Sequence, residues 1–115
     1  MYDPGTAKPW RERVWTHLLP FRPASPLDEA LRLDLFFEFE RPVSHFGKKG
    51  LRASAPREHM SRPDVDNLTK AVMDEMSELG FWRDDDRVVS LAVSKAWARE
   101  AGRFGCLIAL SRLSP

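Results

Sequence analysis

Cysteine is almost absent from this sequence, because Cys106 is the only one among 115 residues. A lone cysteine cannot form a disulfide within the chain, so the composition excludes a disulfide-stabilised scaffold and favours a reducing cytoplasm. Cys106 lies in an apolar run, and we expect it to be a small buried core residue. Long apolar runs are also absent, since none approaches the roughly 20 residues of a membrane-spanning helix. We expect no membrane association and a cytoplasmic location.

An excess of charge of one sign is missing too, since the formal net charge is only +1. Internal repeats and low-complexity tracts are absent as well. The chain has 43% hydrophobic and 30% charged residues, with a mean hydropathy of −0.42, which is typical of a folded domain. From its length we expect one domain spanning residues 1–115.

The charges that are present are separated along the chain. Residues 41–62 carry six basic side chains and one acid, a net charge of +5, whereas residues 64–86 carry eight acids and two basic side chains, a net charge of −6. This pattern suits a polyanion site where metal bridges protein carboxylates and phosphate. Two solvated stretches that pair with each other explain it equally well. The candidates for phosphate contacts are Lys48, Lys49, Arg52, Arg57 and Arg62.

Hydrophobic periodicity predicts two helices and three strands. The predicted helices span residues 8–19 and 66–79, and the predicted strands span 31–40, 87–97 and 103–113. We expect a long loop at 43–63, where glycine and proline punctuate a basic stretch, and a hairpin turn near Gly102 between the last two strands. This order predicts an α+β fold with a small sheet packed against two helices.

Carboxylates gather at the start of the second predicted helix. Asp64 and Asp66 flank this start, and Lys70 follows Asp66 by one turn on the same side of the helix. The acidic turn Asp84–Asp86 offers a further carboxylate. Oxygen ligands of this kind suit Mg²⁺ or Mn²⁺. Phosphodiester hydrolysis needs such a metal and a cation that stabilises the developing negative charge.

Each of these residues also has a simpler structural interpretation. An isolated aspartate at a helix start is usually an N-cap worth about 1 kcal/mol. Three consecutive aspartates usually form an exposed turn, and a helical lysine is usually solvated. The combination favours a site, because one cap needs only one acid and clustered carboxylates repel each other unless a cation lies between them.

Two motifs of the chain resemble a known family. They are RPDVDNLTKAVMD (residues 62–74) and GFWRDDDRVV (residues 80–89), and the resemblance to the RusA family of Holliday junction resolvases covers residues 41–97. It implies a RusA-like fold with a mixed sheet, an intertwined homodimer and a Mg²⁺-dependent endodeoxyribonuclease, with Mn²⁺ as a substitute and no organic cofactor. It further implies symmetric cleavage of four-way DNA junctions by metal-activated water in recombination and repair, and a bacterial or phage origin.

The resemblance also implies roles for individual residues. Asp64 and Asp66 match the first two catalytic aspartates of the family, and Lys70 matches its catalytic lysine. Asp85 matches the third catalytic carboxylate, with Asp84 as the alternative if the alignment shifts by one residue. Asp64, Asp66 and Asp85 are therefore the expected metal ligands, and the number of metals stays open.

The chain departs from the family pattern at its start. Family members usually begin with a strand, whereas this sequence starts close to the first predicted helix, so we expect that strand to be missing. Two other hypotheses remain. One is a catalytically weak branched-DNA-binding protein derived from a truncated or prophage homologue. The other is a structural domain whose aspartates only cap and turn.

Overall fold

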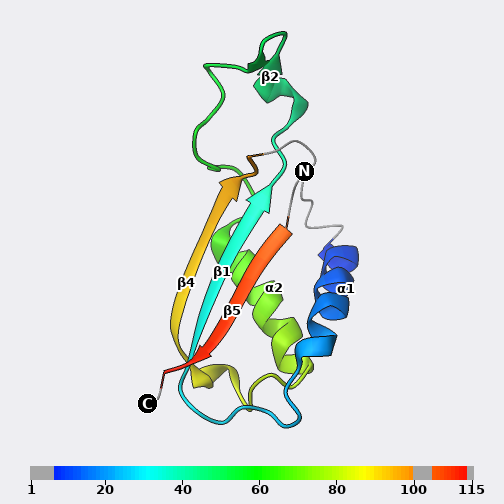
Figure 1. Cartoon of the computed structure of the whole chain (residues 1–115), viewed down its shortest axis with the longest axis vertical. Helices are drawn as coiled ribbons and strands as arrows, with labels where there is room; N and C mark the ends of the chain where they lie inside the picture. Colours follow the sequence, from blue (N-terminus) through cyan, green and yellow to red (C-terminus); the bar gives the residue numbers. More distant parts are fainter. Residues whose placement is uncertain (1–6, 100–104, 114–115) are drawn as a thin grey trace.

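The computed structural model describes residues 7–99 and 105–113, with both helices on one face of a mixed three-stranded sheet (Figure 1). This architecture confirms the predicted α+β class. The helices are α1 (Ala7–Leu18) and α2 (Val65–Glu78), and the strands of the main sheet are β1 (Leu31–Phe39), β4 (Val88–Trp97) and β5 (Gly105–Arg112). A 3₁₀ turn, Leu19–Phe21, continues α1. The expected absence of a first strand concerns the chain before α1, where residues 1–6 lie outside the described part.

Strand β1 lies in the centre of the sheet, in the order β4-β1-β5. It pairs in parallel with β4 and antiparallel with β5. The predicted hairpin between the last two strands is wrong in its pairing, because β1 separates them. Strand alternation reports which face of a strand is buried but not which strand lies beside it. The turn near Gly102 lies outside the described residues.

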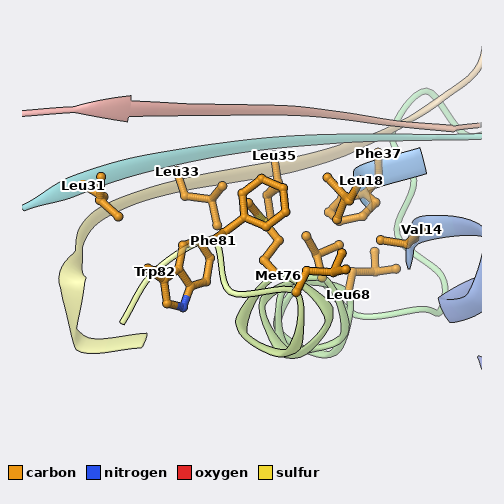
Figure 2. Packing of buried hydrophobic residues seen from close by; sticks show 12 residues of the cluster. Val14, Leu18, Leu31, Leu33, Leu35, Phe37, Leu68, Met76, Phe81 and Trp82 are labelled. Atoms are coloured by element: carbon orange, nitrogen blue, oxygen red, sulfur yellow. The ribbon is translucent and has the colours of Figure 1, made fainter. Parts of the chain in front are cut away.

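The core forms between β1 and α2. Leu31, Leu33, Leu35 and Phe37 of β1 are at most 3% exposed, and Figure 2 shows them pointing toward α2. Their alternation with Arg32, Asp34, Phe36 and Glu38 is the pattern of a strand that buries one face. Helix α2 contributes a buried row, and α1 closes one side of the core; their core residues are Leu68, Val72, Met76, Val14 and Leu18. Burying each large side chain contributes about 2 kcal/mol.

Residues 42–63 form a folded excursion rather than a structureless loop. They contain a 3₁₀ turn, Val43–His45, and a small hairpin of β2 (Phe46–Gly47) and β3 (Gly50–Leu51). Gly50 has φ +100°, which permits the tight two-residue turn at Lys48 and Lys49. Strands of two residues are too short to give a periodic signal, so the sequence did not predict them. We call residues 41–62 the basic loop.

The two ends of the molecule differ in their chemistry. The basic loop lies at one end, with the N-terminus of α2 near its base, and the acidic turn, with the 3₁₀ segment Asp85–Arg87, lies at the other end (Figure 1). The chain extends 53 Å along its longest axis, and the basic loop projects at one end of it (Figure 1). Among the described residues, no helix has the length and apolar content that crossing a membrane requires.

Candidate metal and nucleic-acid site

Asp64 occupies the N-cap position of α2 without capping it. Its backbone is extended (φ −73°, ψ 149°) and its carbonyl accepts the first helical hydrogen bond, from Leu68 N–H at 3.1 Å. Its carboxylate makes no cap hydrogen bond, and the side chain is exposed. The simple capping interpretation therefore fails for Asp64, because the position is that of a cap but the side-chain interaction is missing.

Asp66 and Lys70 lie one turn apart on the exposed side of α2. One oxygen of Asp66, Oδ1, accepts the backbone N–H of Asn67 at 3.0 Å, and within the described residues the other oxygen accepts no hydrogen bond. Four residues along a helix place Lys70 on the same face as Asp66. The N-terminal end of the helix favours negative charge, so the helix dipole partly offsets the repulsion between Asp64 and Asp66.

Lys95 holds the backbone that leads into Asp64. Its ammonium donates to the carbonyl of Ser61 at 2.5 Å and to that of Pro63 at 2.9 Å. Lys95 is half-buried on β4, where it pairs with Phe37 on the side of the sheet that faces the helices. Sequence reasoning missed this residue, although a lysine in the inward phase of a strand, between Val93 and Trp97, was the available signal.

An aromatic cluster attaches the base of the basic loop to the ends of β1 and β4. The ring of His59 lies 4.2 Å from that of Trp97 and 4.7 Å from that of Phe39, and the ring of His45 meets Trp97 edge-on at 5.0 Å. The Trp97 indole also donates to the carbonyl of Glu58 at 3.1 Å. His59 is 6% exposed, and burial, with the charge of Lys95, lowers the pKa of its imidazole.

Arg41 adds two further contacts to this cluster. Its guanidinium lies over the Trp97 ring at 5.5 Å, and it donates to the carbonyl of Pro56 at 2.8 Å. No periodic pattern could predict the contacts of this cluster, because they join residues that lie far apart in the chain.

The five predicted phosphate contacts all lie on the basic loop and are exposed. Lys48 and Lys49 form the tip of the small hairpin. Arg52 reaches back across the hairpin and donates to the carbonyl of Phe46 at 3.1 Å, while Arg62 lies two residues before Asp64. The first two carboxylates therefore lie at the start of α2, near the base of the basic loop, whose tip projects away from them (Figure 1).

Asp85 lies at the opposite end of α2. Its Oδ1 accepts hydrogen bonds from the hydroxyl of Ser77, in the last turn of the helix, and from the indole of Trp82 at 2.8 Å. Eleven residues of helix separate Asp66 from Ser77, which is roughly 16 Å at 1.5 Å per residue. Within one chain, the structure brings Asp64, Asp66 and Lys70 together and leaves Asp85 apart from them.

The neighbours of Asp85 have other partners. Asp84 caps the 3₁₀ segment by accepting the backbone N–H of Asp86 at 3.1 Å. Asp86 pairs with Arg87 at 2.6 Å, and Arg87 also pairs with Asp28 at 2.7 Å. The hydrogen bond from Arg87, together with the charges of Arg87 and Arg83, lowers the pKa of the Asp28 carboxyl. Of the three consecutive aspartates, Asp85 is the one whose carboxylate accepts hydrogen bonds from neutral side chains, within the described residues.

The donor chemistry of Asp64 and Asp66 fits a hard divalent cation. Asp64 and Asp66 offer exposed carboxylate oxygens of the type that Mg²⁺ and Mn²⁺ prefer. In residues 7–99 and 105–113, however, no group of three or more His, Cys, Asp or Glu side chains could hold a metal ion.

Comparison with known proteins identifies the family. A family model described as endodeoxyribonuclease RusA matches residues 1–105. The uncharacterized protein YqaN of Bacillus subtilis (strain 168) is 29% identical over 103 residues, which cover 87% of this chain and 72% of that protein.

Shorter matches come from named enzymes. The crossover junction endodeoxyribonuclease RusA of Escherichia coli (strain K12) is 45% identical over 43 residues, covering 37% of this chain and 36% of that protein. A protein of the same name from Shigella sonnei (strain Ss046) matches to the same extent. Because the family match extends over most of the chain and agrees with the two motifs, the chain belongs to the RusA endodeoxyribonuclease family.

Proposed function

We propose that this protein is a Mg²⁺-dependent endodeoxyribonuclease that resolves Holliday junctions as a homodimer. The observation that carries the proposal is the pair of exposed carboxylates, Asp64 and Asp66, at the start of α2, where the basic loop returns to the body of the molecule. Family membership supports it, because the nucleases of this family depend on divalent metal. The substrate is four-way DNA in recombination and repair, in the cytoplasm of a bacterial or phage-infected cell.

Within one chain, each group of residues has a different role in the proposed reaction. Asp64 and Asp66 hold the metal, which when bound supplies an activated water and charge stabilisation for phosphodiester hydrolysis. Lys70, one turn further along α2, offers its ammonium to the negative charge that develops at the scissile phosphate. The basic loop grips the neighbouring phosphates, and its anchor on Trp97 and Lys95 keeps this grip in register with the carboxylates.

A second copy of the chain would supply the third carboxylate. Asp66, Lys70, Met73 and Ser77 follow one another at intervals of four, three and four residues, so they share one face of α2. The sheet covers the opposite face. If two α2 helices meet antiparallel across this face, the Asp85 held at Ser77 of one copy approaches Asp64 and Asp66 of the other. A dimer with two-fold symmetry then has two equal sites, which suits paired cuts in a four-way junction.

Cleavage of a synthetic four-way junction tests the activity directly. The wild type should cut in Mg²⁺ and in Mn²⁺ and should stop cutting when the metal is chelated. Asp66→Asn should abolish cleavage and retain junction binding, because it removes a metal ligand but no phosphate contact. The matched control is Asp74→Asn on the same helix, since Asp74 makes only a half-exposed ion pair with Arg11 at 3.7 Å and should keep full activity.

A gel shift without cleavage by the wild type would favour the alternative, a catalytically weak branched-DNA-binding protein. Neither binding nor cleavage would contradict both nucleic-acid functions.

Mixing two inactive variants tests the shared site. Asp66→Asn and Asp85→Asn should each be inactive alone. In a mixed dimer, one site carries both substitutions and the other carries neither, so nicking should recover to about a quarter of the wild-type sites when the chains exchange at random. If all three carboxylates acted within one chain, every site in the mixture would be defective and no nicking would return.

A further inference from the structure

The carboxylate of Asp85 is held by two side chains from two different parts of the chain. Its Oδ1 accepts the hydroxyl of Ser77 and the indole N–H of Trp82, whose nitrogen lies 2.8 Å from Asp85 and 2.9 Å from the Ser77 oxygen. Ser77 belongs to the last turn of α2, whereas Trp82 follows that helix. An exposed aspartate in an ordinary turn needs no such support, because water satisfies it.

The core fixes the Trp82 donor. Trp82 is 2% exposed, and Figure 2 shows its ring beside Phe81, with the nitrogen on the side away from the sheet. The backbone on both sides of Trp82 is tied to Leu27, which donates to the Phe81 carbonyl at 3.0 Å and accepts the Arg83 N–H at 2.9 Å. The indole therefore cannot follow the carboxylate if it moves, and the carboxylate is held where the core places the indole.

Both donors engage the same oxygen and both are neutral. Within the described residues, no cation pairs with Asp85, and its second oxygen, Oδ2, is left for a ligand. Hydrogen bonds of this kind orient the carboxylates that bind metal ions and raise their affinity. We propose that Ser77 and Trp82 are positioning residues, which fix Asp85 so that Oδ2 binds the divalent metal. This inference rests on the proposed function, and it couples the metal site to the hydrophobic core.

The direct test follows the indole resonance of Trp82 in ¹⁵N-labelled full-length protein during a Mg²⁺ titration without DNA. The spectrum of Trp82→Phe identifies the resonance by its absence. Binding of Mg²⁺ at Oδ2 draws electron density from the carboxylate that accepts the indole proton, so the Trp82 resonance should shift. The shift should vanish in Asp85→Asn. A Trp82 resonance that does not move while Mg²⁺ binds elsewhere on the protein would overturn the inference.

Variants of Ser77 provide a second test. Ser77→Ala should weaken the Mg²⁺ midpoint, measured by the same titration, by roughly tenfold. Ser77→Thr retains the hydroxyl and should stay close to the wild type. Ser94→Ala, an exposed serine on β4, is the matched control for loss of a hydroxyl. Equal midpoints for Ser77→Ala and the wild type would contradict the proposal, even if Trp82→Phe failed to fold.

These measurements separate the inference from the proposed function. A Trp82 shift in a protein that cuts no junction supports the metal role of Asp85 and removes the nuclease proposal. Junction cleavage with no Trp82 shift and no effect of Ser77→Ala leaves the nuclease standing and removes the positioning role. If the protein cuts no junction and its Trp82 resonance does not shift, both the proposed function and the positioning role are contradicted.

Discussion

The two ends of helix α2 hold their carboxylates in opposite ways. At the N-terminal end, Asp64 makes no cap hydrogen bond and Asp66 accepts only the adjacent backbone N–H. At the C-terminal end, Asp85 is fixed by Ser77 and by the core residue Trp82. At the N-terminal end the helix positions the backbone of Asp64 and Asp66, but no side chain holds their carboxylates. These carboxylates can therefore adapt to a metal and a phosphate. The second end has a preset carboxylate, which suits a group delivered across an interface.

Neutralising the preset carboxylate should have the largest effect. Asp85→Asn should lower junction cleavage by at least about a hundredfold, because the proposed metal site then loses one of its charged ligands. Asp84→Asn is the control and also decides between these two neighbours, since asparagine can still accept the Asp86 N–H as a cap. Single-turnover cleavage of both variants measures the difference. A greater loss in Asp84→Asn would move the third ligand to Asp84.

Removing the restraint behind Asp64 should have the next largest effect. Lys95→Met leaves the carbonyls of Ser61 and Pro63 without their charged donor, and it should cost about 2 kcal/mol of unfolding free energy. We also expect roughly tenfold slower cleavage, because Asp64 follows the released backbone. Urea unfolding and single-turnover kinetics check the two effects. Lys95→Arg keeps a charged donor and should recover part of the stability and part of the cleavage rate. A fully active Lys95→Met would contradict the role of Lys95 in restraining the backbone before Asp64.

Neutralising the hairpin tip should weaken binding without slowing the chemical step. Lys48→Gln with Lys49→Gln should reduce junction affinity and lower the slope of log affinity against log salt by about two units, which is close to 0.9 per phosphate contact. Binding titrations at several salt concentrations measure the slope. Unchanged slope in the double variant would show that the tip does not contact phosphate.

Acidification should have the smallest effect, a loss of stability through His59, which packs on Phe39 and Trp97 at the base of the basic loop. The pKa of buried His59 is lowered, so the unfolded chain takes up a proton at a pH where the folded chain does not. The contribution of His59 to the free energy of unfolding is fully present above the ordinary histidine pKa of about 6.5. It declines as the pH falls below that value. Urea unfolding from pH 7.5 to 5 should show the decline. His59→Phe should flatten it, and an equal slope in that variant would assign the decline to other groups.

Local patterns in the sequence predicted the elements and the family but not the distances between the charged groups. The alternation from Leu31 to Phe39 and the apolar face of α2 gave the core, because both reflect the period of a single element. The sequence patterns did not predict that β1 lies between β4 and β5, since strand pairing is a long-range property. They also did not predict the small hairpin of β2 and β3. The two motifs predicted Asp85 as a site residue, yet chain spacing could not reveal that it lies a helix length away from Asp66.

Helix α2 also limits how a protein of this kind can change its length. Inserting one residue between Asp66 and Ser77 would rotate one end against the other by about 100° and lengthen the helix by about 1.5 Å. The carboxylates at the two ends of α2 would then no longer share a face of the helix. The basic loop carries no such constraint, because its two ends are attached to strands and its tip projects beyond them. Evolution is therefore expected to vary the reach of the loop while it keeps the span of the helix.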